Sequence, residues 1–493
     1  MPTILTLSFK VDKDPIKRCI LTFMARVEDR YDVAIFGAGP GGIDAALRAK
    51  ELGLTTVLIG EQLGGVCLNI GCIPTEAMLV SAGRITSAAE SGEFGVTTQV
   101  HNPDYAKAVQ RRDKVVAKLG GYIEQSLRVN RIPFIKGRAR FANPFAADIT
   151  AEDGSQQEIL FNYAIVATGS KPKRLQIPGV ELQGVIDSDR LLNFTSAPER
   201  AVFVGAGKLG VEDGEMWTAF GTKAVVLEKQ AQILPSQDGE VAKEFQRLSE
   251  RRGIKYLTEA TILEIQRVQN GLVVVADVRG IKQEFPTDVV VMCIGRDANV
   301  EGLGLENAGL TPDEEGIYTS SDMRTRVPHI FAVGDVTGRF QLAQIASTQG
   351  VIAAEVIAGL DSRFDDSVIE SAVFTDPEIA SVGLTEKAAL DQNMKIIASK
   401  ARFLASGRGV ASGEDKGFAK VIVDEDSGEV VGVHIIGSRA GDLIAAPSQA
   451  VALRLRITEL IKRRPPHPSH YETVYQAYSV AAKEFLGRKR STQ

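Results

Sequence analysis

The chain has 493 residues, with 57 basic and 62 acidic side chains and a net charge of −5. A mildly acidic surface attracts neither nucleic acid nor an anionic membrane, so both are excluded as main partners. Four cysteines are too few for a secreted disulphide scaffold, and they favour a reducing compartment, here the cytoplasm. No uninterrupted apolar run reaches the roughly 18 residues of a membrane-spanning helix. At about 150 residues a domain, the length indicates about three domains.

The first residues differ in character from the rest of the chain. Their apolar stretch is short and is flanked by charges, unlike a signal peptide, and Asp12 and Asp14 are unusual in a transit peptide. Met24 opens a segment with the character of a natural start. We therefore interpret residues 1–23 as a disordered extension or a start-site artefact.

Two segments, residues 32–59 and 201–228, share one design: a strand, a glycine-rich turn, a helix and a second strand. A Gly-x-Gly-x-x-Gly turn in this context lets the backbone approach a pyrophosphate and directs a helix N-terminus at it. The duplication predicts two dinucleotide sites, most economically for a flavin and a nicotinamide. Their glycines are Gly37, Gly39 and Gly42 in the first copy, and Gly205, Gly207 and Gly210 in the second.

An acidic residue about 20 positions after the first glycine usually binds the ribose hydroxyls in such a unit. Glu228 follows Gly205 by 23 positions, so we expect it to bind a ribose and to repel a 2′-phosphate, which favours NAD over NADP. In the first copy the equivalent position is Gly60, and Glu61 comes one residue late. Glu61 is therefore expected to bind the ribose less ideally, unless the turn is shifted.

Cys67 and Cys72 lie in the segment GGVCLNIGCIP, directly after the first unit. Their spacing does not suit zinc, which prefers two to four intervening residues and further ligands nearby. A pair beside a flavin site is interpreted as redox-active, although two inert core cysteines remain an alternative. Cys19 and Cys293 are expected to be inert.

The rest of the chain predicts smaller elements. Residues 137–170 and 257–294 alternate apolar and polar side chains around turn signals, which predicts antiparallel insertions. The last third mixes strands at 420–423 and 430–436 with a helix at 440–463, which the prolines of 463–468 end.

His467 and Glu472 lie five positions apart in this C-terminal region. A histidine that acts as a base near neutral pH needs a partner such as a carboxylate to fix its tautomer and raise its basicity. An exposed histidine in an ordinary Pro-rich loop fits the spacing equally well.

These segments together resemble the pyridine nucleotide-disulphide oxidoreductases. The resemblance runs from about residue 31 to residue 486 and includes family-like segments at 166–169, 293–296, 332–335, 375–378 and 467–472. It implies an α/β fold with two Rossmann-like dinucleotide-binding domains and an α+β C-terminal dimerisation domain. The implied domains are FAD-binding 24–160, NAD-binding 161–298, central 299–365 and interface 366–493.

The resemblance also implies roles for single residues. Asp335 is expected at the ribityl-phosphate region of FAD, Ala343 beside its isoalloxazine ring, and Gly295 near NAD. The family pattern of His-Pro followed by Glu favours His467 as a base held by Glu472. His470, which intervenes, is expected to be a surface residue.

Within the family the chain is most similar to members that oxidise dihydrolipoamide. The resemblance then implies a homodimer in which His467 of one subunit reaches the disulphide of the other and removes a thiol proton. The substrate thiolate attacks Cys67, Cys72 leaves as a thiolate against the flavin, and electrons pass to FAD and then as hydride to NAD. Lipoyl domains of a 2-oxo acid dehydrogenase complex are the implied partners.

One departure from the family concerns charge. Glu76 stands where the family usually has a Lys that pairs with a glutamate at the position of Glu212, which is expected near the flavin. Two carboxylates at ~4 Å and an effective dielectric of ~20 repel by about 4 kcal/mol. Lys208, four positions before Glu212, is hypothesised to supply part of the missing charge. Asp213 also stands where an apolar residue is common.

Two alternatives stay open. In the first, the chain is a different NADH-dependent reductase of the same family, which acts on another disulphide or on a quinone. In the second, it is a catalytically weakened flavoprotein that serves as a structural subunit. Glu76 and Gly60 favour weakening, whereas the intact cysteine pair and the His467–Glu472 pair count against it.

Overall fold

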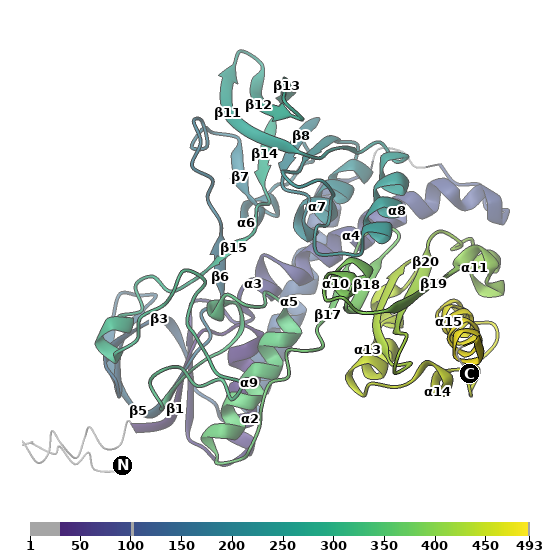
Figure 1. Cartoon of the computed structure of the whole chain (residues 1–493). Helices are drawn as coiled ribbons and strands as arrows, with labels where there is room; N and C mark the ends of the chain where they lie inside the picture. The colour runs from purple at the N-terminus through teal and green to yellow at the C-terminus, as the bar shows by residue number, and fades with distance from the viewer. Residues whose placement is uncertain (1–29, 100–102, 492–493) are drawn as a thin grey trace, which may run out of the picture. The chain divides into compact units, whose positions relative to one another are not determined.

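The computed structural model describes residues 30–99 and 103–491 (Figure 1). The expectations for residues 1–23 and for Cys19 fall outside this range. The chain divides into two units that are interleaved in sequence. The first unit comprises the chain up to Gly65, Gly120–Ser170 and Asp297–Phe364; the second comprises Val66–Leu119, Lys171–Arg296 and the chain from Asp365 onward.

The first unit is built on a parallel sheet in the order β3-β2-β1-β5-β16. Its strands are β1 (Arg30–Phe36), β2 (Thr56–Gly60), β3 (Phe134–Asn143), β5 (Gln156–Val166) and β16 (Ile330–Ala332). The buried parts of the central strands, Val33–Phe36 and Val57–Ile59, are apolar, as expected where helices cover a parallel sheet on both faces. Helices α2 (Pro40–Glu51) and α9 (Ala343–Ile357) lie side by side against it, as Figure 1 shows.

Strands β3 and β5 each change partner along their length. The start of β3 pairs with β2 and the end of β5 pairs with β1, whereas their other halves pair antiparallel with β4 (Ala146–Ala151). The antiparallel insertion predicted for 137–170 is therefore confirmed only in part, because residues 161–166 belong to the parallel sheet. The short helices η2 (Leu305–Ala308) and η3 (Gly334–Thr337) complete the unit, while β6 (Ser170–Pro172) begins at Ser170 and continues into the second unit along the chain.

The second unit repeats the design with a parallel sheet in the order β10-β9-β8-β14-β7. Its elements are β7 (Val185–Asp187), α6 (Ser188–Leu191), β8 (Arg200–Val204), α7 (Lys208–Ala219), β9 (Lys223–Leu227), α8 (Gly239–Glu250), β10 (Lys255–Leu257) and β14 (Val289–Met292). Strand β15 (Arg296–Ala298) begins at Arg296 and continues into the first unit along the chain. The antiparallel insertion predicted for 257–294 is confirmed for β11 (Ala260–Val268), β12 (Gly271–Val278) and β13 (Ile281–Thr287), but residues 289–292 belong to the parallel sheet as β14.

The cysteine segment forms α3 (Gly65–Asn69) and α4 (Cys72–Glu90), followed by η1 (Ser91–Phe94) and α5 (Tyr105–Val129). Helix α4 packs against α7 of the same unit. Within the described part of the chain, Gly65–Phe94 is the one helical stretch long and apolar enough to cross a membrane by length and composition, and a third of its 18-residue apolar window is buried.

The C-terminal part of the second unit is an antiparallel sheet in the order β17-β18-β21-β20-β19. The strands are β17 (Glu370–Val373), β18 (Ile379–Gly383), β19 (Ile396–Arg402), β20 (Phe418–Asp424) and β21 (Val430–Ile436). Its other elements are α10 (Glu386–Asp391), η4 (Phe403–Ala405) and α11 (Gly407–Ser412). Together with the two parallel sheets, it confirms the predicted fold class.

The helices after β21 differ from the prediction. The single helix expected at 440–463 is wrong: the segment forms α12 (Ala440–Leu443), α13 (Ala445–Ala452) and α14 (Ile457–Leu460). One break falls at Arg454, whose φ of 50° does not continue a right-handed helix. Helix α15 (Tyr471–Ser491), which packs on β19 and β20, was not predicted at all.

Candidate functional site

The first glycine of each turn lies where two strands end. Gly37 has φ of 118°, and a Cβ there would lie 2.1 Å from the carbonyl oxygen of Ala167, just past β5. Gly205 has φ of 100°, and its Cβ would lie 2.5 Å from the carbonyl oxygen of Cys293, just past β14. Both positions therefore require glycine for conformation and for space.

The other two glycines of each turn shape a helix N-terminus. A Cβ at Gly42 or Gly210 would lie 1.9 Å from the carbonyl oxygen of the first glycine in its turn. Gly39 and Gly207 are the N-caps of α2 and α7, carry no side-chain cap, and have nothing within 4 Å of the Cβ position. This open space beside uncapped N–H groups fits a pyrophosphate, so the turns fit the two dinucleotide cofactors.

The acidic residues of the two units lie in different surroundings. Glu228 is buried, its Oε2 accepts the Ala206 N–H at 2.7 Å, and its Oε1 accepts the Gln230 N–H at 2.8 Å. A carboxylate fixed in this way retains lone pairs for ribose hydroxyls. Glu61, by contrast, is exposed and forms an ion pair with Arg138 at 2.8 Å.

The other expected cofactor residues lie at loop and helix starts. In η3 of the first unit, Asp335 Oδ2 accepts the Ser170 hydroxyl at 2.6 Å. Ala343 is the first residue of α9. In the second unit, Gly295 has φ of 104° and its carbonyl accepts the Lys173 N–H at 2.9 Å.

The two cysteines occupy adjoining helices. Cys67 lies within α3 and is partly buried, whereas Cys72 is exposed and is the first residue of α4. The preceding residue, Gly71, offers no side-chain cap. A thiolate at a helix N-terminus is stabilised by the open N–H groups and the helix dipole. Of the pair, Cys72 therefore lies where a thiolate is favoured.

Charged side chains from α4 and α7 gather around Cys72. Burial raises the pKa of Glu76 and raises that of Glu212 to about 7, and the charge of Lys208 opposes both shifts. Cys72 and Glu76 each add to the upward shift of the Glu212 pKa. The predicted proximity of Glu76, Lys208 and Glu212 is thus present, and Lys208 interacts favourably with both carboxylates.

One backbone contact of this group was not predicted. The N–H of Phe374 donates to Glu212 Oε1 at 2.7 Å, and the Lys208 ammonium lies 5.2 Å from the centre of the Phe374 ring. Phe374 is 162 positions from Glu212, so no local pattern could have indicated the contact.

We predict that Glu76→Lys makes Cys72 more reactive. Reversing the charge one helical turn from the thiolate favours the ionised form, and about 1.4 kcal/mol of extra stabilisation is a tenfold effect. The measurement is the rate of iodoacetamide alkylation of the reduced protein at pH 7. Glu76→Gln, which removes the negative charge without adding a positive one, is the control and should give an intermediate rate. An unchanged rate in both variants would show that Glu76 does not act on the thiolate.

His467 and Glu472 form a direct contact. His467 Nδ1 lies 2.9 Å from Glu472 Oε1, and the Ser469 N–H donates to Glu472 Oε2 at 2.9 Å. These two hydrogen bonds hold the pKa of Glu472 below its usual value. The His467 side chain is 77% exposed, so the carboxylate holds Nδ1 while most of the ring stays accessible.

His470 corrects a sequence expectation. It was predicted to be a surface residue, but it is buried, with Nε2 3.0 Å from Glu414 Oε2 and its ring centre 6.2 Å from that of Phe403. The prediction was wrong because α15 was not foreseen. His470 directly precedes that helix, which packs its first turns into the core of the C-terminal sheet.

Comparison with known proteins identifies the family. The model for pyridine nucleotide-disulphide oxidoreductases matches residues 31–350, and the model for their dimerisation domain matches residues 369–478. The chain belongs to the pyridine nucleotide-disulphide oxidoreductase family. Like other members of this family, it is an FAD-dependent, NAD-linked oxidoreductase, and its dimerisation domain supports a homodimer.

Relatives within the oxidoreductase family cover nearly the whole chain. A dihydrolipoyl dehydrogenase of Bacillus subtilis is 35% identical over 465 residues, which is 92% of this chain and 98% of the relative. One from Halobacterium salinarum is 36% identical over 463 residues, covering 92% and 96%.

Two solved structures share the fold. LpdA from Mycobacterium tuberculosis superposes with a TM-score of 0.83 at 25% identity, covering 92% of this chain and 99% of that one. The HOCl-induced flavoprotein disulphide reductase RclA from Escherichia coli, solved as a Cu(II) complex, gives 0.82 at 25% identity with the same coverage.

Proposed function

We propose that this chain oxidises dihydrolipoamide with NAD⁺ through FAD and a redox-active Cys67–Cys72 disulphide. The observation that carries the proposal is the His467–Glu472 contact of 2.9 Å, because a thiol substrate needs a base to become a nucleophile. The full-length similarity to dihydrolipoyl dehydrogenases supports it.

The cofactors have separate sets of proposed ligands. FAD would be held by Gly37, Gly39, Gly42, Asp335 and Ala343, with Glu61 as a weaker ligand; NAD would be held by Gly205, Gly207, Gly210, Glu228 and Gly295. Glu212 is proposed to act on the flavin through its charge. When bound, the two cofactors supply electron-pair acceptance and hydride transfer, while the protein supplies alignment and proton transfer.

The proposed role of the chain's own residues is thiol–disulphide exchange. His467 of one subunit accepts the proton of a substrate thiol at Nε2, and Glu472 stabilises the resulting imidazolium. The substrate thiolate forms a mixed disulphide with Cys67, and the sulphur of Cys72 leaves as a thiolate at the N-terminus of α4. The second substrate thiolate then displaces Cys67, which gives cyclic lipoamide and the reduced pair.

Partners, compartment and domain limits belong to the same proposal. The dithiol is carried by lipoyl domains of a 2-oxo acid dehydrogenase complex, and the protein acts in the cytoplasm, where thiols stay reduced. The proposed FAD-binding domain is 24–160, the NAD-binding domain 161–298, the central domain 299–365 and the interface domain 366–493.

Anaerobic titration of the purified holoenzyme with dihydrolipoamide, and separately with NADH, tests the function. A long-wavelength thiolate-to-flavin charge-transfer band with both reductants is the expected result. Flavin reduction by NADH without that band, and no response to dihydrolipoamide, would contradict the proposal. That outcome would favour a quinone reductase or a structural flavoprotein. Glu76→Lys, which restores the residue usual in the family, would then be the first variant to make.

A further inference from the structure

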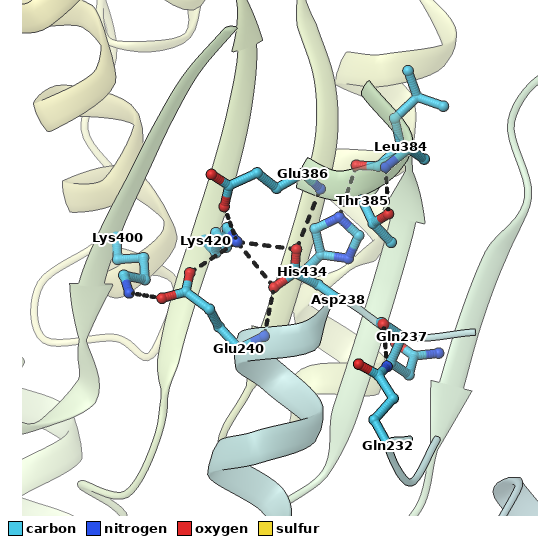
Figure 2. A network of polar contacts seen from close by, with 11 residues as sticks. Gln232, Gln237, Asp238, Glu240, Leu384, Thr385, Glu386, Lys400, Lys420 and His434 are labelled. Carbon is cyan, nitrogen blue, oxygen red and sulfur yellow. Dashed lines mark hydrogen bonds and ion pairs between the residues drawn. The ribbon is translucent and has the colours of Figure 1, made fainter. Parts of the chain in front are cut away.

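A buried lysine on β20 binds three carboxylates. Lys420 Nζ lies 2.9 Å from Asp238 Oδ1, 2.8 Å from Glu240 Oε2 and 2.6 Å from Glu386 Oε2. Figure 2 shows these side chains converging from the start of α8, from α10 and from the sheet. We call these four residues the Lys420 cluster.

The Lys420 cluster has a buried centre and an exposed rim, since the side chains of Glu240 and Glu386 are 45% and 38% exposed. The side chains of Lys420 and Asp238 are each 2% exposed. Burial lowers the pKa of Lys420, but hydrogen bonds to Glu240, Glu386 and Asp238 together outweigh it and raise the pKa. Burial raises the pKa of Asp238, but Lys420, His434 and the Glu386 N–H together outweigh it and lower the pKa. An ammonium and a carboxylate buried together stabilise one another, and removing one leaves the other uncompensated.

Asp238 is also a backbone anchor. As the N-cap of α8, its Oδ1 accepts the Glu240 N–H at 3.1 Å, and its Oδ2 accepts the Glu386 N–H at 3.3 Å. Asp238 is also the last residue of the segment 229–238, which begins directly after Glu228. One carboxylate thus links the helix, α10 and this segment to Lys420.

The segment 229–238 touches the second glycine turn. The Leu234 N–H donates to the carbonyl of Ala206 at 2.8 Å, and Leu234 has φ of 47°, a conformation that surrounding contacts must hold. The Gln237 N–H donates to the Leu234 carbonyl at 2.9 Å, immediately before Asp238. The Ala206 carbonyl therefore accepts a hydrogen bond from the Leu234 N–H, and the Ala206 N–H donates one to the Glu228 carboxylate.

We propose that Lys420 is a positioning residue for the nicotinamide dinucleotide, acting through Asp238 and the segment 229–238 on the Ala206 turn and on Glu228. The inference rests on the proposed NAD site at the second glycine turn. The new element is that Lys420, which lies in the interface domain and outside the NAD site, determines how fully that site adopts its binding conformation before the nucleotide arrives. Without the Lys420 charge, the carboxylates of Asp238, Glu240 and Glu386 repel one another, and Asp238 loses the contact that ties the end of the segment to β20.

A neighbouring lysine provides a matched control. Lys400 lies directly opposite Lys420 in the β19–β20 register, but it is 44% exposed and contacts only Glu240 of the cluster. Lys400→Met therefore removes the same charge from the same part of the sheet while leaving Asp238 bound to Lys420. It is expected to leave nucleotide binding unchanged.

The test measures ADP-ribose binding to the holoenzyme by calorimetry, since this probe carries the adenosine ribose but cannot reduce the flavin. Lys420→Met should weaken binding about tenfold, within the range of coupling effects of residues that do not touch a ligand. The KM for NAD⁺ should rise by a similar factor while kcat changes less than twofold. Hydrogen exchange at the Leu234 N–H should also become faster.

Asp238→Asn guards against a variant that fails to fold. Asparagine keeps the helix cap but loses the charge that binds Lys420, so the same weakening is expected in smaller measure. Unchanged ADP-ribose binding and unchanged exchange at Leu234 in a folded Lys420→Met protein, or in Asp238→Asn if the former does not fold, would overturn the inference. Failure of the wild-type protein to bind ADP-ribose would instead overturn the proposed NAD site, and the inference with it.

Discussion

Replacing His467 with Gln lowers the rate of dihydrolipoamide oxidation by between about 100-fold and 10,000-fold, the usual contribution of a general base. The structure supplies the reason, since Glu472 holds Nδ1 and leaves Nε2 of a largely exposed ring to accept the proton. The measurement is steady-state turnover with dihydrolipoamide and NAD⁺ at saturating substrate.

The same variant should retain NADH oxidation by ferricyanide, because that reaction bypasses the thiol substrate. Glu472→Gln serves as the graded control: the amide still accepts a hydrogen bond from Nδ1 but no longer stabilises the imidazolium, so we expect a smaller loss. Equal loss of both activities in His467→Gln would point to a folding or dimerisation defect and would contradict the role as a base.

Replacing Asp213 with Val stabilises the protein at pH 8 by about 1–3 kcal/mol, the range for an unfavourably buried polar group. Asp213 lies on α7 and is 2% exposed, and burial, followed by the charge of Glu212, raises its pKa well above the usual value of 3.8. Because the folded protein holds this proton more tightly than the unfolded chain does, ionisation favours unfolding. The destabilisation is absent below about pH 4 and grows as the pH rises.

Glu212 acts in the same direction, since its pKa is raised from 4.5 to about 7 by burial. The free energy of unfolding of the wild-type protein should therefore fall between pH 4.5 and pH 7, and part of that slope should vanish in Asp213→Val. Urea denaturation of the holoenzyme at several pH values measures both effects. Asp213→Asn removes the same part of the slope but keeps a buried polar group, so it should stabilise less. A variant slope equal to the wild-type slope would contradict the assignment.

Local sequence was sufficient for the dinucleotide-binding units. Apolar strands of five to seven residues, glycines at fixed offsets and the acid at Glu228 are all encoded within segments of about 30 residues, and the structure shows each of these segments in the predicted form. The His467–Glu472 contact agrees with the family pattern over five positions, whereas the helices α3 and α4 at the two cysteines were not predicted.

What sequence could not supply depends on distant contacts. Lys420 and Asp238 are 182 positions apart, and Phe374 reaches Glu212 across 162. The burial of His470 depends on α15 docking onto β19 and β20, because a histidine between Pro-rich and polar neighbours carries no core signal of its own. Tertiary packing decides such positions after the local pattern has been satisfied.

The interleaving of the two units in the sequence affects how the protein folds during translation and which fragments of it can fold. Strand β16, which completes the first sheet beside β5, is translated about 165 residues after it, at roughly 5–20 residues per second. The β16-facing edge of β5 therefore waits many seconds for its partner on the ribosome, a period in which chaperones would need to shield it. No single truncation leaves either unit intact, because each unit consists of three separate stretches of the chain. A library of fragments should therefore yield few folded proteins. A circular permutant opened at an exposed turn, by contrast, keeps every strand pair.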